Sequence, residues 1–170
     1  DGENTMETGG LVGYLKGHII RSSFTGSIYK NGPVGGIAGN VVGATITESY
    51  FSGNLSGNDR VYAIADGDKF SAVRNSSAQV SLGDHDKFGI SGSNADVDDV
   101  YVLLNSGSVA VKDDLTSTDA VDAYIIDAAG ISESFGLTPV TVENSTYIAA
   151  VDAMAFDWGD TWRVTESFPE

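Results

Sequence analysis

The chain has 170 residues, of which 24 are Asp or Glu and 9 are Lys or Arg, so its formal net charge at pH 7 is −15. A field of this sign repels phosphate groups, which argues against nucleic acid or an anionic membrane as partners. Cysteine is absent, which excludes disulfide-stapled folds and thiolate metal sites. No apolar run approaches the ~20 residues that span a bilayer, so we expect no membrane insertion.

The acidic excess is concentrated in the second part of the chain. The segment 1–60 carries five acids and four bases, whereas the segment 61–170 carries nineteen acids and five bases, a net charge of −14. The length suits one domain that buries a real core. The sequence begins with polar residues and ends without a tail, so we expect it to be a segment of a longer protein.

A glycine-rich unit is written twice in the first third of the chain. After a lead-in over residues 1–8, the unit begins with Gly9-Gly10-Leu11-Val12-Gly13 and returns as Gly35-Gly36-Ile37-Ala38-Gly39. The offset between the copies is 26 up to Gly43 and 27 from Ile46 onward, which places one inserted residue at a corner. A period of this length is typical of stacked repeat architectures.

The pattern within each unit predicts short strands. Apolar residues come in bursts of two to four between Gly, Ser, Asn or Thr, without a sustained helical period. We therefore predict an all-β fold, a right-handed parallel β-helix (β-solenoid) whose coils of about 26 residues each turn through three short strands. The predicted turn glycines, of which the double glycines allow a positive φ, are Gly9, Gly10, Gly13, Gly35, Gly36 and Gly39.

The period continues after the glycines are lost. Ile64, Val73, Ser76 and Leu82 each follow their counterpart in the second unit at an offset of 27, and a fourth unit resumes at Gly89-Ile90. We predict coils over residues 9–34, 35–60, 61–86 and 87–104, with the apolar strand of the last one over 100–104. Leu11, Ile37, Ile64 and Ile90 should form one internal ladder.

Residues 105–170 read as irregular coils that end in an aromatic cap. Residues 109–111, 139–142 and 146–148 are strand candidates, whereas the stretch near 118–129 has two interpretations. A short helix capped at Thr118-Asp119 is one, and a strand through Tyr124–Ile126 is the other. Trp158 and Trp162 would close the end of the solenoid or, alternatively, stack on a sugar.

The doubled motif resembles a known repeat family. Gly9-Gly10-Leu11-Val12-Gly13 with Ser22-Ser23-Phe24-Thr25-Gly26, together with its second copy, is similar to the GLUG repeat, strongly over residues 9–57 and weakly over 61–104. The resemblance implies a non-catalytic segment of a large secreted or surface-attached bacterial protein such as an adhesin. The chain departs from the family pattern at Tyr14, where Asn is usual, and by losing the double glycine after residue 60.

Few residues suggest site chemistry. Asp96, Asp98 and Asp99 are candidate calcium ligands, with a solvated acidic face as the alternative, because carboxylates suit this hard cation. Asp84-His85-Asp86 reads as a turn rather than a metal or base site, and His18 as an exposed turn residue. No nucleophile elbow, phosphate loop or catalytic triad is present in the sequence, so we predict no catalytic residues and no cofactor other than calcium.

Two classes of function remain open. The first is a non-enzymatic, extracellular structural or interaction segment that contacts other copies of the chain, neighbouring domains, a glycan or a surface. It would act by extension and presentation, and its exposed ends would allow self-assembly. The alternative is a polysaccharide-acting β-helix enzyme, a lyase or hydrolase using Asp98, Asp99, Lys112, Asp113 and Asp114, or a carbohydrate-binding module.

Overall fold

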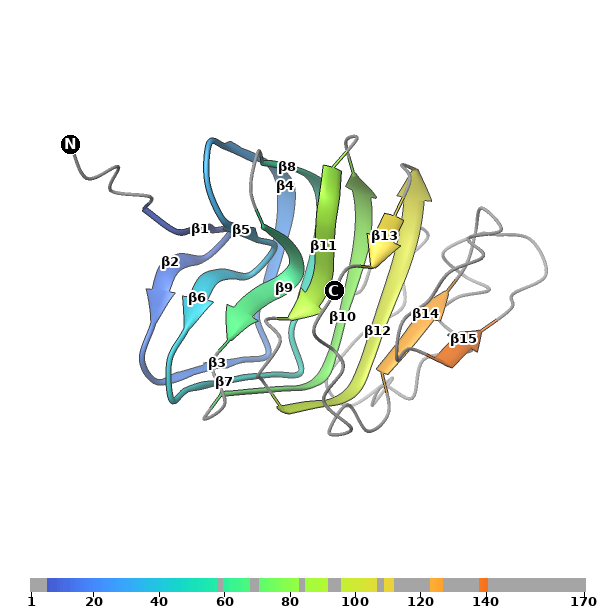
Figure 1. Ribbon diagram of the computed structural model, residues 1–170. Helices are drawn as coiled ribbons and strands as arrows, with labels where there is room; N and C mark the ends of the chain where they lie inside the picture. Colours follow the sequence, from blue (N-terminus) through green and yellow to red (C-terminus); the bar gives the residue numbers. More distant parts are fainter. Residues whose placement is uncertain are drawn as a thin grey trace.

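The protein is described by a computed structural model over residues 6–57, 60–67, 71–82, 85–91, 96–106, 109–111, 123–126 and 138–140. Within these ranges every regular element is a β-strand and no helix occurs (Figure 1). The strands run parallel to their neighbours throughout the recorded pairings and form two sheets. The all-β prediction is therefore confirmed for the described residues.

The first two repeats each contain four short strands. The first repeat comprises β1 (Thr8–Gly9), β2 (Val12–Leu15), β3 (His18–Ile20) and β4 (Ser23–Lys30), and the second comprises β5 (Val34–Gly35), β6 (Ala38–Val41), β7 (Thr45–Thr47) and β8 (Tyr50–Gly57). In the third repeat β9 (Val61–Gly67) pairs with both β5 and β6, and β10 (Ala72–Leu82) pairs with both β7 and β8. The sequence predicted three strands per repeat, whereas the first two repeats each have four. In the third repeat these four merge into two longer strands.

Later strands extend the same two sheets. They are β11 (His85–Ser91), β12 (Asp96–Ser106), β13 (Val109–Val111), β14 (Ala123–Ile126) and β15 (Thr138–Val140). One sheet follows the order β1-β5-β9-β11-β13 with β2 and β6 alongside, and the other follows β15-β14-β12-β10-β7-β3 with β4 and β8 alongside. Each strand therefore lies beside the equivalent strand of the next repeat, and Figure 1 shows this succession from blue to yellow.

Register follows the spacing read from the sequence. Val12 pairs with Ala38, an offset of 26, whereas Ile19 pairs with Ile46, an offset of 27. Two residues separate β2 from β3, and three separate β6 from β7, so the insertion lies at this corner. Gly43 adopts a φ of 58° there, a left-handed conformation that glycine accepts at little cost. The predicted corner insertion is confirmed.

The spacing shortens after the third repeat. Val73 still pairs with Ile46 at an offset of 27, but Val73 pairs with Val97 at 24, and Val100 pairs with Ala123 at 23. Residues 123–126 form β14, so of the two interpretations of the region near 118–129 the strand is correct there and the helix is wrong. The Tyr and Ile residues of this stretch favour a strand, and pairing with β12 supplies its main-chain partners.

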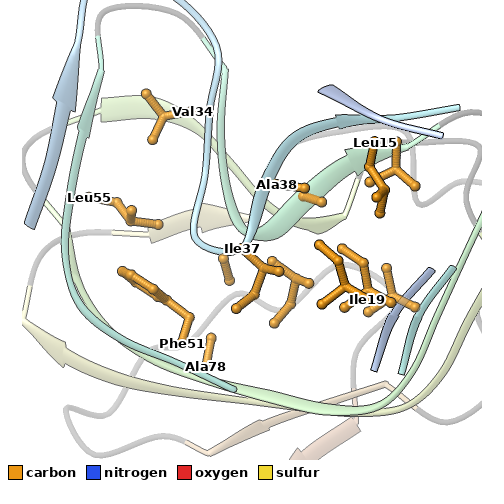
Figure 2. Close-up of a cluster of buried hydrophobic side chains, with 14 of the residues drawn as sticks. Leu15, Ile19, Val34, Ile37, Ala38, Phe51, Leu55 and Ala78 are labelled. Atoms are coloured by element: carbon orange, nitrogen blue, oxygen red, sulfur yellow. The ribbon is translucent and has the colours of Figure 1, made fainter. Parts of the chain in front are cut away.

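Alternation along the strands directs apolar side chains between the two sheets. In β4, Phe24 and Ile28 point inward while Ser23, Thr25 and Ser27 are exposed. The fully buried members of the core include Ile37, Ile46, Phe51, Leu55 and Ile64. Figure 2 shows this cluster, with Phe51 and Leu55 extending toward Ile37 from the opposite side.

The predicted internal ladder differs from expectation at its first member. The Leu11 N–H donates to the Ile37 carbonyl at 2.9 Å, and the Ile37 N–H donates to the Ile64 carbonyl at 2.8 Å. Ile37 and Ile64 are fully buried, whereas Leu11 is 40% exposed. Its repeat has a described neighbour on one side alone. Ile90 lies in β11, where the pairing with β9 shifts register between Gly89 and Ser91.

The double glycines are required by close approach rather than by a positive φ. Among the described residues the glycines with positive φ are Gly17, Gly26, Gly32, Gly43 and Gly53, and neither double glycine is among them. A Cβ on Gly36 would collide with the Ala63 carbonyl and approach the Phe51 ring to 2.6 Å, and one on Gly10 would collide with the Gly36 carbonyl and the Phe24 ring. Gly10 and Gly36 lie at bends, whereas Gly9, Gly13, Gly35 and Gly39 lie within strands rather than turns.

Replacing Ile37 with Ala should lower the unfolding free energy by about 2–5 kcal/mol, because a fully buried side chain leaves a cavity between repeats on either side. Leu11→Ala is the matched control, since the equivalent side chain is 40% exposed and should cost clearly less. Denaturant titration of both variants measures the difference. Equal losses in the two variants would contradict the stacking of Ile37 between its neighbours.

Candidate functional site

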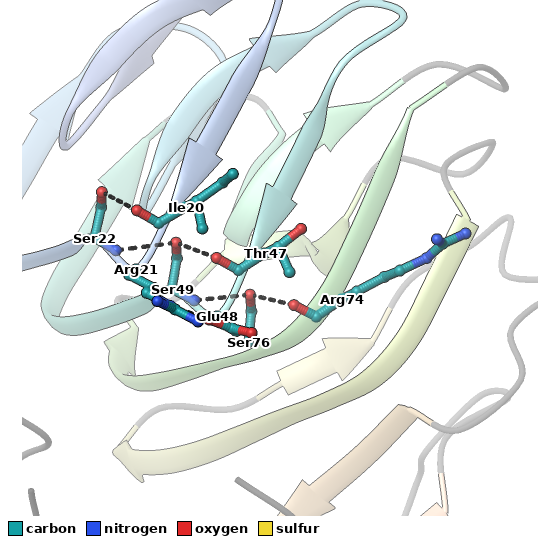
Figure 3. A network of polar contacts seen from close by, with 8 residues as sticks. All are labelled: Ile20, Arg21, Ser22, Thr47, Glu48, Ser49, Arg74 and Ser76. Carbon is teal, nitrogen blue, oxygen red and sulfur yellow. Dashed lines mark hydrogen bonds and ion pairs between the residues drawn. The ribbon is translucent and has the colours of Figure 1, made fainter. Parts of the chain in front are cut away.

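A column of serines forms the most regular polar feature of the described residues. Ser22, Ser49 and Ser76 occupy equivalent positions at an offset of 27 (Figure 3). Ser22 and Ser49 come just before β4 and β8, and Ser76 lies at the same place within the longer strand β10. Each hydroxyl donates to the carbonyl two residues earlier: Ser22 Oγ to Ile20 O at 2.9 Å, Ser49 Oγ to Thr47 O at 2.9 Å and Ser76 Oγ to Arg74 O at 2.8 Å. This bond fixes the turn into the following strand.

The same hydroxyls join successive repeats. The Ser49 N–H donates to Ser76 Oγ at 3.1 Å, and the Ser22 N–H donates to Ser49 Oγ at 3.4 Å. Ser49 and Ser76 are fully buried. A buried hydroxyl with both donor and acceptor roles filled avoids the desolvation cost of an unpaired polar group. Serine at this corner therefore specifies both the turn and the alignment of one repeat on the next.

The residue before each serine has a left-handed backbone. Arg21, Glu48 and Asn75 have φ values of 50°, 49° and 45°, which non-glycine residues seldom adopt. The Arg21 N–H donates to the Thr47 carbonyl at 3.1 Å, and the Glu48 N–H donates to the Arg74 carbonyl at 3.1 Å. Arg21 Nε also contacts Glu48 Oε2 at 2.6 Å on the surface. Bonds to the next repeat thus hold the corners at Arg21 and Glu48 in this conformation.

A second polar cluster is formed by side chains of β6 and β9 together with Glu7 and Arg60. Arg60 Nη1 lies 3.1 Å from Asp66 Oδ2, and Tyr62 hydrogen-bonds to both side chains. Asp66 is the register partner of Asn40, whose Nδ2 donates to Glu7 Oε1 at 2.8 Å. The cluster thus crosses three neighbouring repeats.

Burial shifts the ionisation of this cluster. It raises the pKa of Tyr62 to about 12, with the nearby Asp66 charge adding to the increase. Burial also raises the pKa of Asp66, and Glu7 adds to the increase, while Arg60 and the Tyr62 hydroxyl oppose it. A phenol with a pKa near 12 stays protonated at neutral pH and acts as a hydrogen-bond donor. Tyr62 is accordingly suited to fastening strands rather than to proton transfer at neutral pH, which needs a group that titrates near that pH.

The candidate calcium ligands lie in one strand. Asp96, Asp98 and Asp99 are in the first half of β12, where Asp96 pairs with Ala72 and Asp98 with Arg74. Their side chains are outside the described part of the molecule, so calcium binding stays a prediction. Among the residues that the structure describes, no group of three or more His, Cys, Asp or Glu side chains is arranged to hold a metal ion.

Other predicted positions have mixed outcomes. His18 begins β3 rather than occupying a turn, and its Nδ1 lies 2.8 Å from Thr45 Oγ1. Residues 85–86 begin β11, which pairs with β13, so the turn predicted for Asp84-His85-Asp86 is wrong over that part. Trp158, Trp162 and residues 112–114 lie outside the described residues. The group expected for the polysaccharide-acting alternative, which includes residues 112–114, therefore stays a prediction.

Sequence reasoning missed the left-handed corners and the cluster around Tyr62. The corners carry a usable signal, because positions 21, 48 and 75 are polar, recur at an offset of 27 and precede the repeated serine. The cluster carries no such signal, since Glu7, Asn40 and Asp66 differ in type and are brought together by register alone.

The chain was compared with known proteins in three ways. No family model, no curated protein and no solved structure matches it significantly. In the described part of the molecule no helix has the length and apolar character needed to cross a membrane.

Ser49→Ala should destabilise the protein by about 1–3 kcal/mol, because it leaves the Ser22 N–H without its acceptor and the Thr47 carbonyl without one donor at a buried corner. Ser22→Ala is the matched control. Its hydroxyl makes the same turn bond at a partly exposed corner of the first repeat, so the loss should be smaller. Thermal or denaturant unfolding measures both, and equal losses would contradict a role for the serine in joining repeats.

Asp66 should make the folded state less stable as the pH rises. Its folded pKa lies above the ordinary value of 3.8, so between these two values the folded chain holds more protons than the unfolded chain. The unfolding free energy therefore falls as pH increases through that window.

Asp66→Asn should remove this contribution, so the variant should gain stability relative to the parent protein from acidic to neutral pH. Denaturant titrations of both proteins between about pH 3.5 and pH 7 measure the difference, which cancels the contributions of other acids. Repeating them in high salt controls for exposed charges, which salt screens. A difference that stays constant, or changes in the opposite direction, would contradict the burial of Asp66 as a charged group.

Proposed function

We propose that the described repeats belong to a right-handed parallel β-solenoid of the GLUG-repeat type, and that this solenoid is a non-enzymatic structural segment of an extracellular, surface-exposed protein. Its action is passive. Stacked repeats set a length and direction and present polar outer faces, as an adhesin-like rod requires. The resemblance over residues 9–57 supports the family and the location.

The observation that carries this proposal is the in-register stacking of equivalent residues. Ile19 pairs with Ile46, Ile46 pairs with Val73, and Val73 pairs with Val97, in parallel each time. A strand that pairs with its own equivalent one repeat later advances by one strand spacing per repeat, about 4.8 Å. Such an arrangement gives a rod whose length grows linearly with the number of repeats.

The columns of like side chains also support a structural role. Phe24 and Phe51 stack with their ring centroids 6.1 Å apart and their planes 8° from parallel. Asn54 Nδ2 donates to Ser27 Oγ at 3.0 Å, and the serines of the corner column bond from one repeat to the next. These side chains are engaged in joining repeats, which is the use expected in a scaffold.

A repeat-insertion experiment tests the proposal. Three copies of residues 35–61 are inserted after Val61, and each junction reproduces the step from Val34 to Gly35, because Val34 pairs with Val61. The extended protein should fold cooperatively, with greater stability. Its maximum dimension in small-angle X-ray scattering should increase by about 14 Å, since each repeat adds about 4.8 Å.

Three copies of residues 35–48 serve as the control. Each copy inserts about half a repeat, so strands of one sheet would have to stack on strands of the other sheet. This protein should lose cooperative unfolding. A folded control, or an unfolded full-repeat insertion, would overturn the solenoid proposal.

A further inference from the structure

The corner between the first and second repeats contains the dipeptide Asn31-Gly32. It lies between β4, which ends at Lys30, and β5, which begins at Val34 (Figure 1). The Asn31 side chain is exposed to solvent, whereas Gly32 is buried. This is the only Asn-Gly dipeptide in the sequence, so any chemistry particular to it is confined to one place in the fold.

The main chain is held on both sides of this dipeptide. Strand β4 stays paired with β8 up to its last residue, Lys30. The Pro33 carbonyl accepts from the Thr8 N–H at 3.3 Å, and the Val34 N–H donates to the Arg60 carbonyl at 2.9 Å. Residues 31 and 32 are therefore a short free stretch between two fixed points, with strands on both sides of the loop in place.

The groups that could react within the dipeptide are unengaged. In the described structure the Asn31 carboxamide makes no hydrogen bond, and the Gly32 N–H has no acceptor. Such an N–H is rare in a buried residue, because it has given up water without gaining a partner. Gly32 has a φ of 143° and no Cβ to crowd its nitrogen. No hydrogen bond has to break before this nitrogen reaches the neighbouring carboxamide.

We propose that Asn31 is a site of spontaneous deamidation in the folded protein, through attack of the Gly32 main-chain nitrogen on the Asn31 side-chain carbonyl carbon. Because the reacting groups are on adjacent residues, the reaction needs no encounter in solution. Asparagine is also one of the thermally labile residue types. The inference is independent of the proposed function, since it concerns the chemistry of a single corner.

The reaction consumes water and no other reagent. The Gly32 nitrogen loses its proton to hydroxide and bonds to Asn31 Cγ, the bond from Cγ to Nδ2 breaks, and ammonia leaves with a proton from water. Water then opens the resulting cyclic imide at either of its carbonyl carbons. Opening at Cγ gives an ordinary aspartyl residue, whereas opening at the main-chain carbonyl carbon gives an isoaspartyl linkage. One water is consumed and one ammonia is released, with no change in oxidation state.

The other asparagines with described side chains lack this combination. The side chain of Asn40 donates to Glu7 at 2.8 Å, and that of Asn54 donates to Ser27 at 3.0 Å. Each of these two asparagines precedes a fully buried, branched residue within a strand. Asn75 is exposed, but it lies inside β10 and precedes a buried serine. These three positions are internal controls within the same chain.

The products change the corner in two ways. Each product adds a negative charge, so the formal net charge of −15 becomes −16, and anion exchange can separate the products from the parent protein. The isoaspartyl form also adds a carbon atom to the main chain. Because Lys30 and Pro33 remain tied to neighbouring strands, the added length has to be taken up at residues 31 and 32.

Incubation of the full, folded chain at mildly alkaline pH, followed by peptide mapping with mass spectrometry, tests the proposal. Conversion at Asn31 should be at least about tenfold faster than at Asn40, Asn54 or Asn75, because only Asn31 precedes a residue without a Cβ. Aspartyl and isoaspartyl products should both form. Digestion at mildly acidic pH, with a sample taken before incubation, controls for conversion during handling.

Asn31→Gln is the matched variant. It keeps the carboxamide but lengthens the side chain by a methylene, so ring closure is disfavoured and conversion at position 31 should be lost. Conversion at Asn40, Asn54 and Asn75 should be the same as in the parent protein. Circular dichroism checks that the variant and the incubated parent protein are folded.

Incubation in urea tests whether the fold leaves the site open. Unfolding should accelerate conversion at Asn75 more than at Asn31, because the fold holds Ser76 in a strand but leaves the Gly32 N–H without a bond. An acceleration at Asn31 as large as that at Asn75 would show that the fold protects Asn31 and would overturn the proposal. So would an unconverted Asn31 in the folded protein, an equal rate at Asn54, or an ordinary aspartyl product alone.

Discussion

Parallel main-chain pairing between residues one repeat apart is the constraint on which the described structure depends. Once Ile19 pairs with Ile46 and Ile46 with Val73, the neighbouring positions of these strands are stacked on their own equivalents. A side chain must therefore suit a neighbour of the same kind above and below. Hydroxyls that can both donate and accept satisfy this condition, and so do flat aromatic rings. Serine and phenylalanine columns are the result.

Residues that pack against each other change together from one repeat to the next. Gly10 lies against Phe24 and Gly36 against Phe51, because a Cβ at either glycine would meet the ring. In the third repeat the equivalent positions are Ala63 and Ala78, both fully buried. Ala78 is smaller than its equivalent Phe51, and Ala63 is larger than its equivalent Gly36. The backbone pairing continues through this exchange, so the period outlasts the double glycine.

The two ends of the described stack differ in a way that bears on function. The first repeat exposes the side chains of Tyr29 and Ile20, whereas the acidic residues accumulate later in the chain. Polar side chains of successive repeats bond to one another, as the serine column and the hydrogen bond from Asn40 to Glu7 show. In a scaffold built this way, specificity for a partner lies at an end or on an outer face, because the inner positions are committed to stacking.

The sequence by itself determined the all-β class, the repeat length and the corner insertion, because a period of 26 or 27 is visible wherever columns repeat. It also located the buried positions Ile37 and Ile64. Tertiary structure alone decided that each early repeat has four strands, that Gly36 is needed for close approach, that Leu11 is exposed, and that residues 123–126 form a strand. These outcomes depend on which backbone lies a few ångströms away, and a local pattern contains no record of that neighbour. The cluster of Glu7, Asn40 and Asp66 shows the same limit, since register alone joins three residues of unlike type.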